Sequence, residues 1–144
     1  MVSITADILI SGGLLVSGTS ITKMDVVVTG EKITDVLPHP SNIDAKRIID
    51  AKGLYVLPGL IDAHNHPINL DKMDSFTLSA AFGGITTVIP FMQNMRSRGI
   101  DGTTSETIDR FIEESNEISY LDFGVHAIFF GADDVEIEVP KLIE

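Results

Sequence analysis

Cysteine is absent from this 144-residue chain, and basic side chains are scarce: ten lysines and arginines stand against 21 aspartates and glutamates, a net charge of −11. Without cysteine the chain can form neither a disulfide nor a thiolate metal site. The acidic balance and the lack of a basic stripe argue against nucleic acid or an anionic membrane as a partner. No positively charged segment precedes an apolar run at the start, so we expect no secretory signal and a cytoplasmic protein.

The charge is uneven along the chain. Residues 101–144 hold 12 acidic and 2 basic side chains, which we interpret as a solvated surface and not as a cation site. Residues 75–95 carry no charge over 21 positions, but they contain paired glycines and a proline, and their pattern changes from helical to strand-like midway. A segment of a folded core explains this stretch better than a membrane span.

Residues 1–57 read as β structure. Short runs rich in valine and isoleucine alternate with glycine or proline turns, and no segment has the caps or the period of a helix. We expect a small antiparallel sheet or sandwich. The predicted strands cover residues 7–10, 14–16, 26–29, 33–37 and 47–49.

From residue 58 the pattern changes to alternating strands and helices. A helix is expected over 72–82, closed by two glycines, and a buried strand over 85–91. Thr103 and Glu106 form a capping-box pattern that opens a second helix, and a strand over 121–130 follows. The inward face of that helix is predicted to carry Ile108, Phe111, Ile112 and Ser115, and a further helix is expected to begin within 139–143. This alternation is typical of parallel βα units, but 144 residues are too few for a (β/α)₈ barrel, which needs about 200–250.

The sequence His64-Asn65-His66 is the main candidate for chemistry. Alternate residues of a strand share one face, so two imidazoles at i and i+2 can converge on one divalent ion. Asp62 has the same parity and either orients these ligands or caps the strand end. His126 is either a pocket residue or a hydrogen-bonded core histidine. His39, between two prolines, is expected to be solvated.

Several segments resemble a known family. PGLIDAHNH (58–66) resembles the PGxIDxHxH signature of the amidohydrolase superfamily, and ADILISGG (6–13) through IIDAKGLY (48–55) is similar to the small β domain that precedes that signature. GGITTVI (83–89) and DFGVH (122–126) resemble the GGTTTxI and DYGFH segments of the dihydropyrimidinase and hydantoinase branch. The resemblance covers essentially the whole chain and implies the N-terminal third of such a protein.

This resemblance implies an α/β fold: a small β-sandwich domain over residues 1–57, then the first three βα elements of an incomplete barrel over 58–144. It implies a metal-dependent hydrolase of cyclic amide bonds, in which a hydroxide held by two divalent ions, expected to be zinc, attacks the ring amide. The His-x-His pair, here His64 and His66, would bind the more buried ion. A bridging carbamylated lysine, two further histidines and a catalytic aspartate would come from later strands. We therefore expect no catalytic residue within this chain and no activity from it alone.

The resemblance also implies a small cyclic amide as substrate and a homo-oligomer, a tetramer, for the full-length protein. No REPG segment follows the histidines, which counts against the dihydroorotase and allantoinase branch. The loop 67–74 looks shorter than in hydantoinases, which leaves the ring substrate open. The alternatives are a non-catalytic amidohydrolase-like protein that serves in oligomerisation or interaction, and a natural short protein without activity. The first usually loses its metal ligands, so the retained His64 and His66 favour the enzyme.

Overall fold

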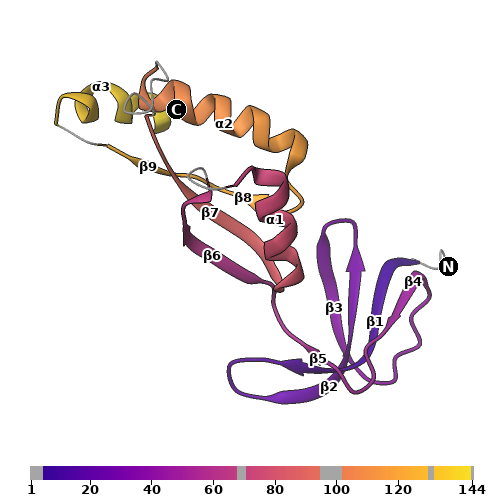
Figure 1. Cartoon of the computed structure of the whole chain (residues 1–144). Helices are drawn as coiled ribbons and strands as arrows, with labels where there is room; N and C mark the ends of the chain where they lie inside the picture. Colours follow the sequence, from indigo (N-terminus) through magenta and orange to yellow (C-terminus); the bar gives the residue numbers. More distant parts are fainter. Residues whose placement is uncertain (1–4, 68–70, 95–101, 130–131, 144) are drawn as a thin grey trace. The chain divides into compact units, whose positions relative to one another are not determined.

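The computed structural model describes residues 5–67, 71–94, 102–129 and 132–143. The chain divides into two compact units, Met1–Pro58 and Gly59–Glu144, and the division falls beside the boundary predicted at residue 57 (Figure 1). The uncharged stretch predicted to be core supplies most of one helix and all of one strand. Among the described residues, no helix combines the length and the apolar character needed to cross a membrane.

The first unit is built on one five-stranded mixed sheet. The first three strands pair antiparallel as predicted, whereas β4 and β5 pair parallel with β1, which differs from the expected all-antiparallel sheet. Its buried cluster consists of Ala6, Leu9 and Val27. The strands are β1 (Ala6–Val16), β2 (Ile21–Thr29), β3 (Lys32–Pro38), β4 (Ala45–Asp50) and β5 (Tyr55–Val56).

A buried carboxylate organises one side of this sheet. Asp25, only 1% exposed, accepts hydrogen bonds from the backbone N–H of Gly12 (2.7 Å) and from the backbone and hydroxyl of Ser41 (2.8 and 2.7 Å). His39 Nδ1 donates a further bond to it at 2.9 Å. Burial alone raises the pKa of Asp25, but these hydrogen bonds outweigh burial and hold the pKa well below its ordinary value.

This cluster corrects the prediction for His39. Its side chain is only 26% exposed and is hydrogen-bonded through Nδ1 to Asp25, so it is not a solvated loop residue. The same cluster lies beside an irregularity in β1. Gly12 has a φ of +72°, and a Cβ there would lie 3.2 Å from the His39 ring, so a glycine is required at the irregularity between Ile10 and Gly13.

The second unit contains a four-stranded parallel sheet in the order β6-β7-β8, with β9 also paired to β7. In Figure 1, β6 and β7 run side by side, and the helices α1 and α2 both contact β7 and each other. These two helices therefore lie on the same side of the sheet. The elements are β6 (Leu60–Asn65), α1 (Met73–Phe82), β7 (Ile85–Gln93), α2 (Thr104–Ile118), β8 (Asp122–Phe123), β9 (His126–Ile128) and α3 (Ala132–Ile143).

The helix-covered side of β7 forms the core of this unit. Val88, Pro90 and Met92 are buried, as are Thr77 of α1 and Ile108 of α2. The predicted inward face of α2 is confirmed, because Ile108 and Ser115 are buried and Phe111 and Ile112 are half-buried. The acidic residues on the other side of α2 lie in the segment predicted to be a solvated surface, and they are exposed: Asp109, Glu113, Glu114 and Glu117.

The helix ends agree with their sequence signals. Thr103 accepts the N–H of Glu106 while the Glu106 carboxylate accepts the N–H of Thr103, so the predicted capping box is present. The helix α1 ends at Gly83 and Gly84, the latter with a φ of +83°. The strand predicted over 121–130 is divided into β8 and β9, and residue 130 lies outside the described part of the chain.

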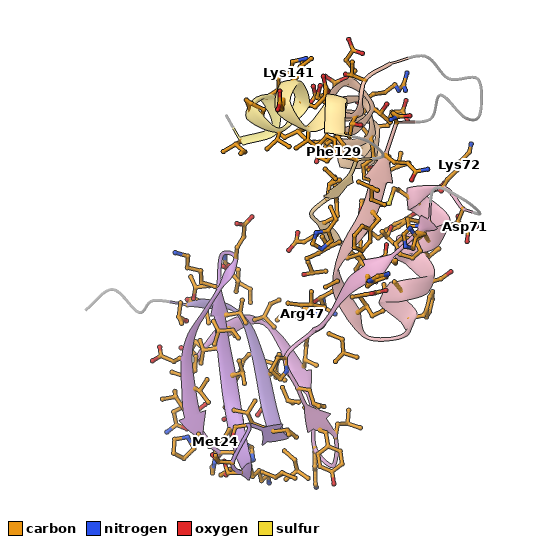
Figure 2. The ribbon with its side chains drawn as sticks, turned by 90° about the vertical axis from the view of Figure 1, so that its left-hand side faces the viewer. Met24, Arg47, Asp71, Lys72, Phe129 and Lys141 are labelled. Carbon is orange, nitrogen blue, oxygen red and sulfur yellow. The ribbon has the colours of Figure 1, made fainter. Side chains whose placement is uncertain are left out.

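A second buried carboxylate joins α3 to α2. Glu138, 4% exposed, accepts from the hydroxyl and the backbone N–H of Ser105 in the first turn of α2, at 2.6 and 3.0 Å. Lys141, labelled on α3 in Figure 2, donates to its other oxygen at 3.0 Å. The hydrogen bonds from Ser105, followed by that from Lys141, lower the pKa of Glu138 to about 2. Helix N-termini favour negative charge, so Glu138 is an internal anionic ligand of α2.

Replacement of Asp25 is expected to destabilise the first unit. In Asp25→Asn an amide nitrogen takes the place of one carboxylate oxygen, so at least one buried N–H or O–H donor loses its acceptor, at a cost of about 2–3 kcal/mol. Urea unfolding followed by circular dichroism measures this loss. The exposed Asp35→Asn variant carries the same charge change and should unfold like the wild type; equal stability of the two variants would contradict the prediction.

Glu138 is expected to make the docking of α3 sensitive to acid. Its folded pKa is lowered from 4.5 to about 2, so its stabilisation is complete above pH 4.5 and is lost as the pH falls through that interval. Glu138→Gln should lack this contribution at pH 7 and show less acid loss between pH 4.5 and 2. Hydrogen exchange at the Ser105 amide measures the docking directly. Glu136→Gln, on the exposed side of α3, is the matched control, and identical acid profiles for wild type and Glu138→Gln would refute the assignment.

Candidate metal centre

The two candidate metal ligands lie at the carboxyl end of β6. His64 is in this strand, and His66 follows its last residue, Asn65. The pairing of β6 with β7 is irregular between Asp62 and Asn65, where β6 contains one more residue than its partner. The Asp62 carboxylate accepts the backbone N–H of His64 at 3.1 Å within this irregular segment. The simple alternation assumed from the sequence therefore does not hold across these residues.

The two imidazoles nevertheless meet. Their ring centres are 5.4 Å apart with an angle of 70° between the planes, and both side chains are exposed. Two imidazoles bound to one tetrahedral ion through bonds of about 2.0–2.1 Å have ring centres about 5 Å apart. The spacing of the ring centres is therefore close to that of two imidazole ligands of one ion, and neutral imidazole suits zinc as well as nickel, copper or iron.

The pair is not a closed site. Within the described ranges, no group of three or more histidine, aspartate or glutamate side chains is placed to hold a metal ion. A structural zinc ion has four protein ligands and a catalytic one usually three, so further ligands are needed. A cavity of about 470 Å³ lies elsewhere, between α2 and the start of α1, where Asp71 and Lys72 are labelled in Figure 2; the histidines do not line it.

Asp62 and Asn65 surround the pair without bonding to the imidazoles. The bond that the structure gives the Asp62 carboxylate goes to the His64 backbone, which is a strand-end cap; its role in orienting a ligand stays a prediction. The Asn65 side chain donates to the Asp62 carbonyl at 3.2 Å. Its Oδ1 is buried and has no partner among the described residues, so this position can accept one more donor.

His126 lies on the same part of the sheet, and the residue that connects it to the pair is one the sequence reasoning missed. The Phe91 ring is 4.7 Å from the ring of His126, 4.6 Å from that of His64 and 5.2 Å from that of His66. His126 is exposed in this chain and pairs in register with Phe91, and its role as a pocket residue stays a prediction. The sequence feature that could have identified Phe91 is its position near the carboxyl end of the strand that follows the histidines.

The chain is similar to known proteins in sequence and in fold. The chain is 32% identical over 144 residues to a D-hydantoinase of Geobacillus stearothermophilus, a match that covers 94% of this chain and 30% of the relative. It is 37% identical over 99 residues to a dihydroorotase of Methanothermobacter thermautotrophicus, covering 65% and 22%. The crystal structure of dihydropyrimidinase from Brevibacillus agri superposes with a TM-score of 0.78 at 28% identity, covering 94% and 30%. No protein-family model matches the chain.

These relatives define an enzyme family of cyclic amidohydrolases. The chain belongs to this family and resembles its hydantoinase and dihydropyrimidinase members, as predicted. It spans about 30% of the length of the curated hydantoinases that it matches.

The histidine pair is expected to give the 144-residue chain a weak site for a divalent ion. Removing one of two ligands should cost at least as much as the loss of an outer contact, which is about tenfold in affinity. We expect His64→Ala and His66→Ala each to weaken Zn²⁺ binding by about tenfold or more, measured by competition with a chromophoric chelator. His39→Ala removes an imidazole that is bound to Asp25 and serves as control. Equal affinity in all four proteins would exclude the pair as ligands.

Proposed function

We propose that the protein containing this chain hydrolyses the ring amide of a dihydropyrimidine or hydantoin, with His64 and His66 as ligands of a divalent ion, zinc. The observation that carries the proposal is the spacing of 5.4 Å between the two rings at the carboxyl edge of a parallel sheet. Functional residues of (β/α)₈ enzymes gather at that edge. The family relationship supports the same substrate class.

A divalent ion held there supplies a Lewis acid that polarises the amide carbonyl and lowers the pKa of water. The chain's own residues would bind the ion and orient its ligands. His64 and His66 must be neutral to act as ligands. The Asp62 carboxylate caps the irregular segment of β6. This segment sets the direction from which the imidazoles of His64 and His66 would approach the ion. His126 is exposed on the far side of Phe91 from these ligands, where it can contact a substrate.

The second unit is proposed to be part of a (β/α)₈ barrel. Its strands are adjacent in their order along the chain and are parallel, and α1 and α2 lie together on one side. A doubly wound sheet has helices on both faces, whereas a barrel has them on the outside alone. The sheet also exposes Leu60 and Ile61 of β6, at 58% and 65%, which indicates apolar surface that further structure covers.

The first unit is proposed to be one layer of a β-sandwich. Its outer strands expose apolar side chains, among them Ile33 of β3 and Ile48 of β4, which are 67% and 62% exposed. A sheet buries one face against another layer, and a second sheet would cover these residues.

The identity of the ring substrate rests on the REPG segment and on the relatives of the chain. The missing REPG segment still favours a hydantoin or dihydropyrimidine, although dihydroorotases and an allantoinase are among the relatives of this chain. The loop that looked shorter than in hydantoinases includes residues 68–70, which lie outside the described part of the chain. The homo-tetramer and the cytoplasmic location implied by the resemblance remain predictions.

The proposal is tested on the protein encoded by the reading frame that contains residues 1–144. It should hydrolyse dihydrouracil or hydantoin, and His64→Ala should abolish turnover together with bound metal. The isolated 144-residue chain should hydrolyse neither substrate, because the described residues bring only two of the required ligands together. Ring opening is monitored as a loss of ultraviolet absorbance, and metal content is measured by elemental analysis.

Two results would overturn this reading. Turnover by the isolated chain would show that two histidines suffice. Metal bound through His64 without hydrolysis of any cyclic amide would instead support the non-catalytic alternative, an amidohydrolase-like protein that serves in oligomerisation or interaction.

A further inference from the structure

Phe91 occupies the centre of a group of three imidazoles. Its ring centre is 4.6 Å from that of His64, 5.2 Å from that of His66 and 4.7 Å from that of His126. The ring is nearly parallel to those of His66 and His126, at 18° and 25°, and inclined by 53° to that of His64. Since β7 lies between β6 and β9, the Phe91 ring separates the histidines of one neighbouring strand from that of the other.

The position of this ring is set by the sheet. The residues on either side of it, Pro90 and Met92, are buried on the helix-covered face, so Phe91 points to the opposite face. It pairs with His126 of β9, while Pro90 pairs with Asn65, the residue between the two ligands. The strand that carries Phe91 is therefore paired on both sides at this position.

The ligands lack such support of their own. Both imidazoles are exposed, and among the described residues neither ring nitrogen of His64 or His66 has a hydrogen-bond partner. An exposed side chain without contacts samples several rotamers, and ordering it on binding an ion costs entropy. Histidine ligands usually obtain their orientation from a hydrogen bond to the second ring nitrogen. Here the contact that restricts the rings is aromatic.

We propose that Phe91 is a positioning residue for the metal ligands: its ring holds the imidazoles of His64 and His66 in the orientation in which they bind the ion. This inference rests on the proposed role of the two histidines as ligands and adds the residue that orders them. It assigns Phe91 no contact with the reacting atoms. Aromatic contacts of this geometry restrict ring orientation because offset and edge arrangements are favoured over others.

The test uses the 144-residue chain and Zn²⁺ alone. Phe91→Leu keeps an apolar side chain but removes the aromatic face, and it should weaken Zn²⁺ binding about tenfold, as the loss of an outer contact to a ligand does. Phe91→Tyr should retain the affinity of the wild type. In proton NMR without metal, the ring protons of His64, His66 and His126 should be displaced by the ring current of Phe91, and Phe91→Leu should abolish that displacement.

Phe123→Leu is the matched control. Phe123 is a half-buried phenylalanine of the same sheet whose ring contacts Phe111 at 6.1 Å, and the structure gives it no contact with the three histidines. If Phe91 had a merely structural role, Phe91→Leu and Phe123→Leu would lose Zn²⁺ affinity to the same extent. Phe91→Tyr would then not retain the affinity of the wild type. Either result, or unchanged Zn²⁺ affinity in Phe91→Leu, would overturn the inference.

The outcomes separate this inference from the function on which it rests. If His64→Ala and His66→Ala abolish Zn²⁺ binding while Phe91→Leu does not weaken it, the ligands stand and the positioning role fails. If the histidine variants bind Zn²⁺ like the wild type, the ligand assignment itself is wrong and the positioning role falls with it.

Discussion

The second unit depends on the two faces of one strand, β7. It pairs on both sides, with β6 and with β8 and β9, and its alternate residues serve different purposes. Val88, Pro90 and Met92 are buried beneath the helices, whereas Phe91 faces the histidines. Because side chains alternate strictly, a slip of one residue would place Phe91 among the helices and expose the core. Packing on one face therefore fixes the position of the aromatic ring on the other.

The elements that the sequence predicted well are those specified by local chemistry. The capping box of Thr103 and Glu106 begins α2, paired glycines end α1, and the period of apolar residues on α2 identifies its buried face. Each of these signals operates within a few residues. The strand predicted over 121–130 was divided because its two halves pair with different parts of β7, and the N–H of Gly124 between them donates to the Val88 carbonyl. A partner distant in the sequence decides that division.

The buried charges could not be predicted for the same reason. Asp25 precedes a run of valines and would be taken for an exposed polar residue, yet its four donors come from Gly12, His39 and Ser41, 13 to 16 positions away. Glu138 accepts a hydrogen bond from Ser105, which is 33 positions away. A carboxylate is buried only where several donors surround it, and the sequence does not show which donors the fold brings together. The histidine pair was predictable because its spacing is local, but Phe91 needed the register between strands.

The chemistry of the histidines and the stability of the exposed sheet surface are linked. The face that bears Phe91, His64 and His66 is opposite the face that α1 and α2 cover, and β6 also exposes Leu60 and Ile61. Apolar surface of this kind is stabilised when further structure covers it. With His64 and His66 as the proposed ligands, any further ligands would approach the same face, since the imidazoles project there. Covering the sheet and completing the ligand set would then be the same event, in which metal binding contributes to folding. An aromatic ring that orders the first two ligands beforehand lowers the entropic cost of that event.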